Sequence, residues 1–207
     1  MIEIPWALSR YAGQQRVLEV GCSFATENPQ YIEGLRALAI PELHGIDISS
    51  VEAPFFIKRT ADIRESGYAA NFFDMILCVS TIEHVGRDNA RHYKPIAELP
   101  LREGDESPPD VLAMEEMLRI LKPGANLILT VPYGRFVDYG WFINYDSSAI
   151  ERLLSVPGIS VAQADYFRYT TAGWVPCAAD QLANTAYGDH GAPAAAGVAC
   201  FEITNRK

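Results

Sequence analysis

Polar residues follow several apolar segments in the first half of the sequence, at the positions where these segments end. The groups are Glu19-Val-Gly-Cys-Ser, Asp47-Ile-Ser, Asp62-Ile and Ser80-Thr-Ile-Glu-His. In an open parallel sheet, ligands bind beyond the carboxyl ends of the strands, where such residues meet. An acid at the end of a strand can also cap the next helix, so Asp47 and Asp62 each have a purely structural alternative. Their common position nevertheless predicts one shared binding site.

The types of these residues suit the recognition of a nucleoside. Gly21 lets the backbone turn tightly beside a ligand, and the Asp47 carboxylate can accept both hydrogen bonds of a ribose diol. Asp62 can accept a hydrogen bond from an adenine amino group, while Ile48 and Ile63 can pack against the faces of the ring. The pattern therefore predicts a bound adenosine.

The apolar segments alternate with polar and helical stretches, as expected for a parallel sheet covered by helices. We expect strands over residues 16–21, 43–48, 55–59, 73–80, 126–131, 159–167 and 198–204. Helices are expected over residues 28–39, 110–121 and 147–154. Residues 86–110 and 169–197 break the alternation and are expected to be functional or mobile loops. The sequence predicts an α/β fold in one domain spanning residues 1–207.

Composition limits the class of protein. The chain has 17 Lys and Arg against 26 Asp and Glu, a net charge of -9, which disfavours nucleic acid as a partner and favours a small-molecule acceptor. The apolar runs are far shorter than the roughly 20 residues of a membrane-spanning helix, and the N-terminus lacks an export signal. We expect no membrane association and a cytoplasmic location. The four cysteines form no CxxC pair and are expected to be buried and unreactive.

The order and spacing of the motifs resemble the class I S-adenosylmethionine-dependent methyltransferases of the small bacterial type. The matching segments are Val17-Leu-Glu-Val-Gly-Cys-Ser, Leu43-His-Gly-Ile-Asp-Ile-Ser, Ala61-Asp-Ile, Phe72-Phe-Asp-Met-Ile-Leu-Cys-Val-Ser-Thr-Ile-Glu-His-Val-Gly and Leu118-Arg-Ile-Leu-Lys-Pro-Gly-Ala-Asn-Leu-Ile-Leu-Thr-Val-Pro. The resemblance implies a doubly wound, mostly parallel, seven-stranded sheet of the Rossmann-like methyltransferase type, with an antiparallel last strand. It also implies S-adenosyl-L-methionine as the cofactor.

The resemblance implies a position on the cofactor for each motif. Glu19, Gly21 and Ser23 should lie along its methionine part, Asp47 and Ile48 at its ribose and base, Asp62 and Ile63 at its adenine, and Val79 and Ser80 on the floor of the site. The usual first loop of the family has two or three glycines, whereas Gly21 is followed here by Cys-Ser-Phe-Ala. We expect the Ser23 hydroxyl to bind the carboxylate of the cofactor in compensation.

Glu83 and His84 follow the fourth predicted strand and provide candidate catalytic groups. Methyl transfer mainly requires alignment of the acceptor with the methyl group, and a base helps when the acceptor atom carries a proton. The near-neutral pKa of a histidine suits His84 for this role, although His84 could instead hold a loop through a backbone carbonyl. Some family members use Glu-x-x-Glu-His as metal ligands. Because Ser80 replaces the first Glu, and only His92 or Glu106 offers a further ligand, no metal is expected.

Aromatic residues after the fifth strand are candidates for a wall beside the acceptor. Tyr133 is the candidate nearest the strand and is grouped with the catalytic residues, followed by Tyr139 and Trp141. Tyr93 and Trp174 lie in the two long loops and offer the same chemistry. Aromatic residues also fill protein cores, so each of these five has a structural alternative.

The resemblance implies methyl transfer to a hydroxyl or amine of a sugar or another small metabolite, by an enzyme that could form a homodimer. This acceptor class rests on analogy with family members. One alternative is a non-catalytic relative that binds the cofactor or a partner protein, suggested by the few glycines of the first loop. The other is a nicotinamide-dependent oxidoreductase, but the first turn lacks the G-x-G-x-x-G that places a pyrophosphate on a helix N-terminus.

Overall fold

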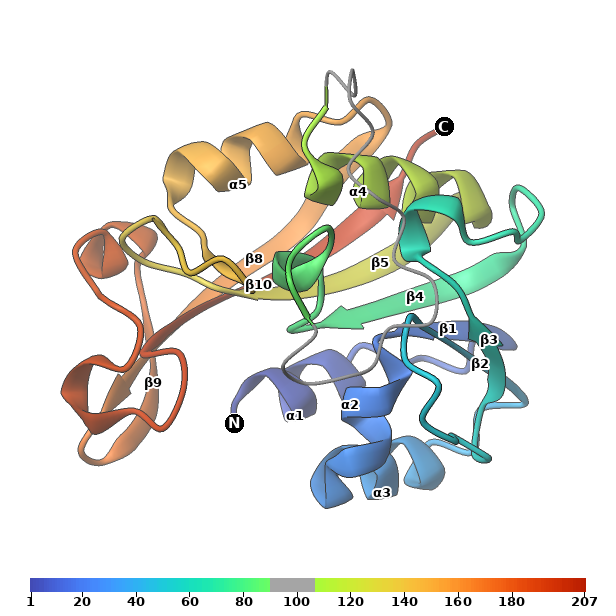
Figure 1. The fold of residues 1–207 in the computed structure, drawn as a ribbon, viewed down its shortest axis with the longest axis horizontal. Coiled ribbons are helices and arrows are strands. Elements are labelled where there is room, and N and C mark those ends of the chain that lie inside the picture. Colours follow the sequence, from blue (N-terminus) through green and yellow to red (C-terminus); the bar gives the residue numbers. More distant parts are fainter. Residues whose placement is uncertain (90–106) are drawn as a thin grey trace.

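A mixed sheet of eight strands has the order β3-β2-β1-β4-β5-β10-β8-β9 (Figure 1). Its strands are β1 (Arg16–Val20), β2 (Glu42–Asp47), β3 (Ile57–Thr60), β4 (Phe73–Val79), β5 (Leu121–Pro132), β8 (Ile159–Thr170), β9 (Gly173–Cys177) and β10 (Gly197–Asn205). The first five pair in parallel, whereas β10 is antiparallel to both β5 and β8. The computed structural model describes residues 1–89 and 107–207. Strands β6 (Val137–Asp138) and β7 (Ile143–Asn144) form a separate ribbon.

The seven predicted strands are present, and the last one is antiparallel as expected. The sheet is wider by one strand because β9 pairs with the end of β8, within the stretch that we expected to be a loop. The pairing of Thr170 with Gly173 makes a tight hairpin. The surrounding Gly, Ala and Pro residues weaken the strand signal of so short a segment, which explains why the sequence did not indicate it.

Helices cover both faces of the sheet, so the doubly wound α/β architecture is confirmed. Figure 1 shows α1 (Glu3–Leu8), α2 (Cys22–Glu27) and α3 (Pro29–Ala37) on one face, and α4 (Pro109–Ile120) and α5 (Ser147–Leu154) on the other. The helix α3 begins where the Asn28 side chain accepts hydrogen bonds from two backbone amides. Asp146 caps α5 in the same way through Ala149. These caps place the helix starts where the sequence predicted them.

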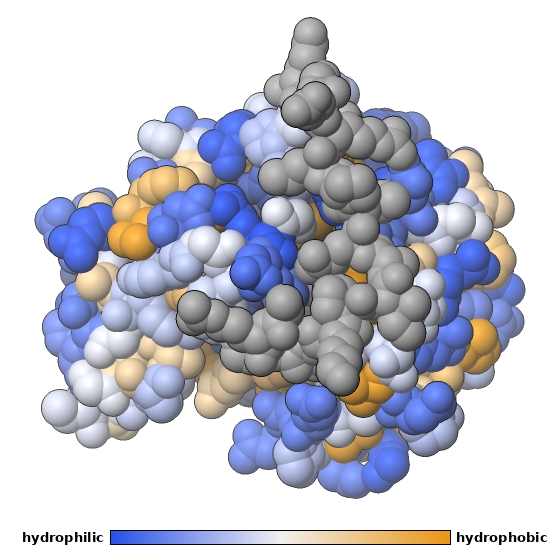
Figure 2. All heavy atoms as spheres, viewed as in Figure 1, coloured by the Kyte–Doolittle hydropathy of each residue, from blue (hydrophilic) through white to orange (hydrophobic). Residues whose placement is uncertain are grey.

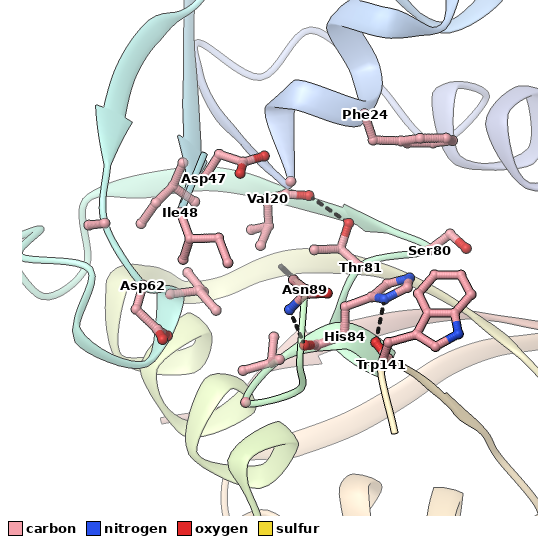
Figure 3. A pocket seen from close by; sticks show the side chains of 16 residues that line it. Val20, Phe24, Asp47, Ile48, Asp62, Ser80, Thr81, His84, Asn89 and Trp141 are labelled. Atoms are coloured by element: carbon pink, nitrogen blue, oxygen red, sulfur yellow. Dashed lines mark hydrogen bonds between the residues drawn. The ribbon is translucent and has the colours of Figure 1, made fainter. Parts of the chain in front are cut away.

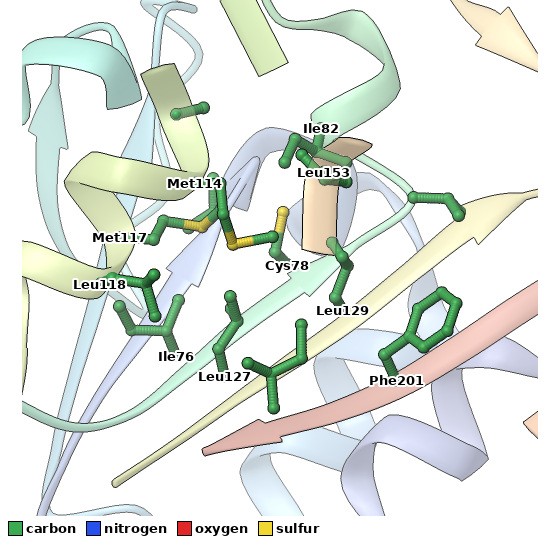
Figure 4. Close-up of a cluster of buried hydrophobic side chains, with 14 of the residues drawn as sticks. Ile76, Cys78, Ile82, Met114, Met117, Leu118, Leu127, Leu129, Leu153 and Phe201 are labelled. Carbon is green, nitrogen blue, oxygen red and sulfur yellow. The ribbon is translucent and has the colours of Figure 1, made fainter. Parts of the chain in front are cut away.

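The core lies on both faces of the central strands, as the continuous hydrophobicity of β4 predicts. Met75 and Leu77 pack with the residues of α1, α2 and α3, whereas Ile76 and Cys78 pack under α4 (Figure 4). Burial of one such side chain contributes about 1.5–3 kcal/mol. The carboxyl end of β4 is therefore held firmly, which fixes the start of the segment that follows it.

Three of the four thiols have the burial that the sequence predicted, and Cys177 is more exposed than expected. Cys22, Cys78 and Cys200 are buried, Cys177 is half-buried, and all four are free. Burial raises the pKa of the Cys78 thiol well above its usual value, so it stays protonated. Because the thiolate is the reactive form, these side chains act as small hydrophobic residues.

The described helices include none that is long and apolar enough to cross a bilayer. On the face shown in Figure 2, hydrophilic residues predominate outside the grey atoms, and hydrophobic residues lie in small groups. His92, Tyr93 and Glu106, which the sequence singled out as possible ligands or acceptor contacts, lie outside the described residues.

Candidate functional site

A pocket with a volume of about 260 Å³ lies at the carboxyl ends of the strands in the first half of the sheet. The strand order reverses there between β1 and β4, which is the usual location of ligand sites in open α/β sheets. The lining residues are Val20, Gly21, Phe24, Ile46, Asp47, Ile48, Ala61, Asp62, Ile63, Ser80, Thr81, His84, Val85, Gly86, Asn89 and Trp141 (Figure 3). The volume is near the lower end of the range for small-molecule sites.

Most of the predicted site residues meet around this pocket. Those that line it are Gly21, Asp47, Ile48, Asp62, Ile63, Ser80 and His84. The two aspartates lie on one side, and His84 lies on the other with Trp141 (Figure 3). The predicted residues that do not line it are Glu19, Ser23, Val79, Glu83 and Tyr133.

Asp47, the last residue of β2, presents a carboxylate that backbone amides hold in place. Its Oδ2 accepts a hydrogen bond from the Ser23 amide at 2.9 Å, and its Oδ1 accepts one from the Ser49 amide at 2.8 Å. An ionised carboxylate has about four lone-pair sites. Each oxygen of Asp47 can therefore accept one more hydrogen bond from a ligand, which is what a diol requires.

Asp62 forms a buried ion pair with Arg64 in the wall of the pocket. The two side chains are 6% and 5% exposed, and Arg64 Nη2 donates to Oδ2 at 2.6 Å. Arg64 Nε and the Arg64 amide also donate to the carboxylate, at 3.0 and 2.9 Å to Oδ1. Nε also lies 3.2 Å from Oδ2, so it shares its one hydrogen between the two oxygens. Because only three N–H groups make these four contacts, the carboxylate keeps room for about one donor from a ligand.

Gly21 caps α2 in a conformation that few other residues adopt. Its φ is 85°, in the left-handed region that favours glycine. A Cβ at this position would lie 2.4 Å from Thr81 Oγ1 and 2.8 Å from Thr81 Cγ2. The Thr81 hydroxyl is itself fixed, because it lies 3.1 Å from the Val20 carbonyl and 3.0 Å from the Val79 carbonyl. The ends of β1 and β4 can approach this closely because residue 21 has no side chain.

The Gly21→Ala variant is expected to lose about 2–4 kcal/mol of unfolding free energy, from the left-handed backbone and the clash with Thr81. Urea unfolding measures this loss. The matched control is Gly13→Ala, because Gly13 has a φ of 92° but no atom within 4 Å of an added Cβ. The control should lose only the backbone part, about 1–2 kcal/mol. Equal losses in the two variants would contradict the role of the close contact.

The side chains after Gly21 do not narrow the pocket. Cys22, Ser23 and Ala25 of the helix α2 are buried. Cys22 packs over Gly45, and a Cβ added to Gly45 would lie 2.7 Å from the Cβ of Cys22. Phe24 alone of these four residues lines the pocket. A short helix therefore replaces the usual glycine-rich loop, and the small side chains of this helix are buried in the core and do not line the pocket.

Glu19 supports the site from behind. Its side chain is fully buried, and the Tyr31 hydroxyl donates a hydrogen bond to Oε2 at 2.7 Å. Burial raises the pKa of the Glu19 carboxyl well above its usual value. Neighbouring side chains along a strand point to opposite faces, so Glu19 lies beside α3 while Val20 lines the pocket.

The segment after β4 begins with a strained residue. Ser80 has a φ of 48°, and its amide donates to the Thr130 carbonyl at 3.1 Å. Its hydroxyl donates to Glu83 Oε1 at 2.8 Å. Backbone strain of this kind concentrates at functional sites. Val79 lies just before it in the core, so Ser80 forms the floor of the pocket while Glu83 braces it from the buried side.

Glu83 lies close to a second buried acid, Glu3 of the helix α1. Glu3 and Glu83 are 5% and 2% exposed, and the Thr130 hydroxyl donates to Glu3 Oε1 at 3.1 Å. Burial raises the pKa of each carboxyl to about 7, and for Glu3 the charge of Glu83 adds to the effect. Both carboxyls are therefore partly protonated at neutral pH.

The Glu83→Gln variant is expected to lose less stability than the wild type as the pH rises from 5 to 8. The pKa of this carboxyl is about 7 in the folded protein and lower in the unfolded chain, so the folded protein binds more protons. The unfolding free energy of the wild type therefore decreases as the pH rises from the unfolded pKa to the folded pKa. The variant lacks this contribution, which is on the order of 3 kcal/mol. Urea unfolding at four pH values measures the slope. An unchanged slope would contradict the raised pKa.

His84 ends the 3-10 helix η2 (Ile82–His84) and keeps one ring nitrogen available. Its Nδ1 lies 2.9 Å from the Trp141 carbonyl oxygen, which can only accept, so Nδ1 carries the proton. Burial lowers the pKa of His84 below its usual value, so the ring is neutral at pH 7 and Nε2 holds a lone pair. This tautomer is the protonation state that a general base requires.

One of the aromatic residues that the sequence proposed as an acceptor wall lines the pocket. Trp141 lies against His84 with ring centroids 5.2 Å apart. Tyr133, Tyr139 and Trp174 do not line the pocket, and their rings pack against other aromatic residues. Tyr133 therefore acts as a core residue in this structure.

A metal site finds no support within residues 1–89 and 107–207. No group of three or more His, Cys, Asp or Glu side chains lies together in these ranges in a way that could hold an ion. The first carboxylate of the possible metal motif is replaced by Ser80, whose hydroxyl instead donates to Glu83.

Several pocket residues were missed by the sequence analysis. They are Val20, Phe24, Ile46, Ala61, Thr81, Val85, Gly86 and Asn89. Thr81, Val85 and Gly86 flank residues that were singled out, so their position at a strand end was a usable signal. Phe24 carried no signal because the helix α2 was not predicted, and helical geometry decides which of its side chains faces the pocket.

Comparison with known proteins identifies the fold. No protein-family model and no curated protein matches the sequence. A SAM-dependent methyltransferase from Archaeoglobus fulgidus matches the structure with a TM-score of 0.63 and 13% identity, over 98% of this chain and 92% of that one. The N-methyltransferase NodS from Bradyrhizobium japonicum WM9, solved with S-adenosyl-L-homocysteine, matches with a TM-score of 0.54 and 15% identity, over 97% and 82%.

A third match has a different activity on the same architecture. The [4+2]-cyclase SpnF matches with a TM-score of 0.59 and 16% identity, over 98% of this chain and 79% of that one. Identities this low define the fold and leave the chemistry to the residues of the site. The sheet order, the helices on both faces and these matches together show that the chain has the fold of the class I S-adenosylmethionine-dependent methyltransferases.

Proposed function

We propose that the protein transfers a methyl group from S-adenosylmethionine to a hydroxyl or amine of a small metabolite. The observation that carries this proposal is one pocket with Asp47 and Asp62 on one side and His84 on the other. The net charge of -9 disfavours a nucleic-acid acceptor. We place the reaction in the cytoplasm, as the sequence predicts.

The aspartate side of the pocket fits the adenosyl part of the cofactor. Asp47 offers one further acceptor position on each oxygen, which matches the two hydroxyls of a ribose. Asp62, held by Arg64, offers about one position, which matches the amino group of adenine. Ile48 and Ile63 add apolar surface for the base. We assign these residues to cofactor binding, together with Gly21 at the close approach of β1 and β4.

The predicted residues that do not line the pocket receive positioning roles in this proposal. Ser23 donates its amide to Asp47 and so orients the ribose acceptor. Glu19 anchors Tyr31 behind the first loop. Glu83 fixes the Ser80 hydroxyl, and Val79 holds the end of β4 in the core. These contacts keep the pocket walls in place without touching a ligand.

The chemistry follows from the side opposite the aspartates. The cofactor supplies a methyl group on a positively charged sulfur with a neutral leaving group. The protein must hold the acceptor atom in line behind that methyl group, which lowers the barrier by orientation. His84 Nε2 accepts the proton that an acceptor hydroxyl or ammonium loses, while the bond from Nδ1 to the Trp141 carbonyl keeps the ring oriented.

A second candidate is binding of the cofactor without methyl transfer. The similarity to SpnF, a [4+2]-cyclase, supports this second candidate, because it shows that the fold also occurs in proteins with another activity. Asp47 and Asp62 would bind the cofactor in both cases, so binding does not separate the two functions. A nicotinamide cofactor is disfavoured, because Gly21 is followed directly by the buried residues of α2 and not by a glycine-rich phosphate loop.

Turnover separates the two candidates. The purified protein is incubated with S-adenosylmethionine carrying a tritiated methyl group and with a panel of small hydroxyl and amine compounds. Transfer of label to an acceptor, with formation of S-adenosylhomocysteine, is the expected result. Tight binding of S-adenosylhomocysteine with no transfer to any compound would favour the binding function over the proposed one.

A further inference from the structure

The end of the pocket next to His84 has two aromatic walls. Phe24 comes from α2 and Trp141 from the turn between β6 and β7, and both line the pocket. In Figure 3 their rings lie at the same end as Ser80 and His84, away from the two aspartates. We call this region, made of Phe24, Ser80, Thr81, His84 and Trp141, the acceptor end. Flat apolar walls of this kind favour a planar, aromatic ligand.

The other polar side chains at the acceptor end already have partners. The Ser80 hydroxyl donates to Glu83, and the Thr81 hydroxyl lies within hydrogen-bond distance of two backbone carbonyls. The neighbouring Asn89 amide donates to the carbonyls of His84 and Arg87. A sugar that brings several hydroxyls into this space would find acceptor oxygens but few donor groups for them, since the Ser80 and Thr81 hydroxyls already donate elsewhere. Each buried group left without a partner costs about 1–3 kcal/mol. These contacts disfavour a sugar and favour an acceptor with one polar group.

The weak basicity of His84 limits which hydroxyl groups can lose a proton to it. His84 is a weak base, because burial lowers its pKa. A phenolic hydroxyl has a pKa of about 10, whereas an aliphatic hydroxyl is nearly as weak an acid as water, whose pKa is about 15.7. A proton therefore moves to His84 far more readily from a phenol than from an aliphatic alcohol.

Charge separates a phenol from an amine. The charged residues that line the pocket are the two aspartates at its far side, so no carboxylate lines the acceptor end among the described residues. A protonated amine would face the positive sulfur of the cofactor with no carboxylate beside it in the pocket, because Glu83 lies behind Ser80 and outside the lining. Like charges repel strongly in a partly buried site. A phenol is neutral when it binds, and it becomes more negative as it reacts, which the positive sulfur stabilises.

We propose that the acceptor is a phenol, bound between Phe24 and Trp141 with its hydroxyl at His84 Nε2. This inference rests on the proposed methyl transfer and narrows its substrate class. The phenolic oxygen forms a bond to the methyl carbon while the carbon–sulfur bond breaks. The electron pair of the broken bond stays on sulfur. The phenolic proton moves to Nε2. The products are an aryl methyl ether, a neutral thioether and a protonated His84 that returns its proton to water.

The first experiment compares three acceptors of similar size with the wild-type protein. Methyl transfer from tritiated S-adenosylmethionine is measured with 4-methylphenol, 4-methylcyclohexanol and 4-methylbenzylamine. The expected result is a kcat/KM for 4-methylphenol at least about 100-fold above the other two, since its proton is easier to remove than that of the alcohol and it carries no positive charge. Calorimetry with S-adenosylhomocysteine runs in parallel.

Variants of the aromatic walls provide the second test. Phe24→Leu and Trp141→Leu should each raise the KM for 4-methylphenol by about two- to tenfold, since a lost aromatic contact is worth about 0.5–1.5 kcal/mol. The affinity for S-adenosylhomocysteine should change by less than about threefold. The matched control is Phe136→Leu, because Phe136 is 45% exposed and does not line the pocket. Its kinetics should match the wild type.

The outcomes distinguish this inference from the function on which it rests. Binding of S-adenosylhomocysteine with faster methylation of the alcohol or the amine, or with no methylation of the phenol, would overturn the phenol assignment alone. An unchanged KM in both wall variants would do the same. Failure of the wild type to bind S-adenosylhomocysteine would overturn the proposed function, and the acceptor assignment with it.

Discussion

The Asp47→Ala variant is expected to bind S-adenosylhomocysteine at least ~100-fold more weakly than the wild type. The carboxylate would accept two ribose hydrogen bonds, and a hydrogen bond to a charged group is worth about 1.5–3 kcal/mol. Their loss amounts to about 3 kcal/mol or more, and each 1.4 kcal/mol is a factor of about ten in affinity. Isothermal titration calorimetry measures the change directly.

Two controls separate lost recognition from lost structure. Asp47 also orders the amides of Ser23 and Ser49, so urea unfolding of Asp47→Ala must show that the variant is folded at the temperature of the titration. Asp47→Asn keeps one acceptor oxygen and should lose about half as much binding free energy as Asp47→Ala, which is roughly a tenfold weaker affinity. Asp180→Ala, which removes an exposed acid of the 3-10 helix η3 (Ala179–Leu182), should bind normally. Wild-type affinity in Asp47→Ala would remove the ribose assignment.

The His84→Ala variant should lose about 10²- to 10⁴-fold in turnover, the usual contribution of a general base, with unchanged affinity for S-adenosylhomocysteine. His84→Gln keeps an amide group but no basic nitrogen, and it should be equally slow. The measurement is single-turnover methyl transfer over a range of pH. The wild-type rate should fall below the lowered pKa of His84, and this acidic limb should be absent in both variants.

Two results would argue against this role. Wild-type turnover in His84→Ala would show that the imidazole serves to hold Trp141 and takes no proton. A slow variant that keeps the acidic limb of the wild-type profile would show that another group titrates. A loss of cofactor affinity together with turnover would instead point to a general distortion of the segment after β4.

The sequence was sufficient to predict the fold because its strongest signals are local. The continuous hydrophobicity of β4 reflects burial on both faces, and the caps at Asn28 and Asp146 mark the starts of α3 and α5. The helix α2 could not be predicted in the same way. Its start depends on the left-handed backbone of Gly21 and on packing of Cys22 over Gly45, and both require the neighbouring strand to be in place.

The sequence predicted the site residues whose position depends only on the sheet topology. It did not predict correctly those whose place depends on the direction of the side chain. Asp47 ends a strand, and Asp62 and His84 follow strand ends, so their meeting at one pocket follows from a parallel sheet. Glu19 lies one residue before such an end, and the alternation along a strand turns it to the other face. That direction could have been predicted from Val20, which must point the opposite way. The approach of Phe24 and Trp141 depends on tertiary packing, which no local pattern reports.

The central claim is that the pocket between Asp47 and His84 binds an adenosyl group. Titration of the wild-type protein with S-adenosylhomocysteine tests it most directly. We expect one site per chain with a dissociation constant in the micromolar range, about 8 kcal/mol of binding free energy. The absence of any binding heat up to millimolar ligand, in a protein that unfolds cooperatively in urea, would contradict it.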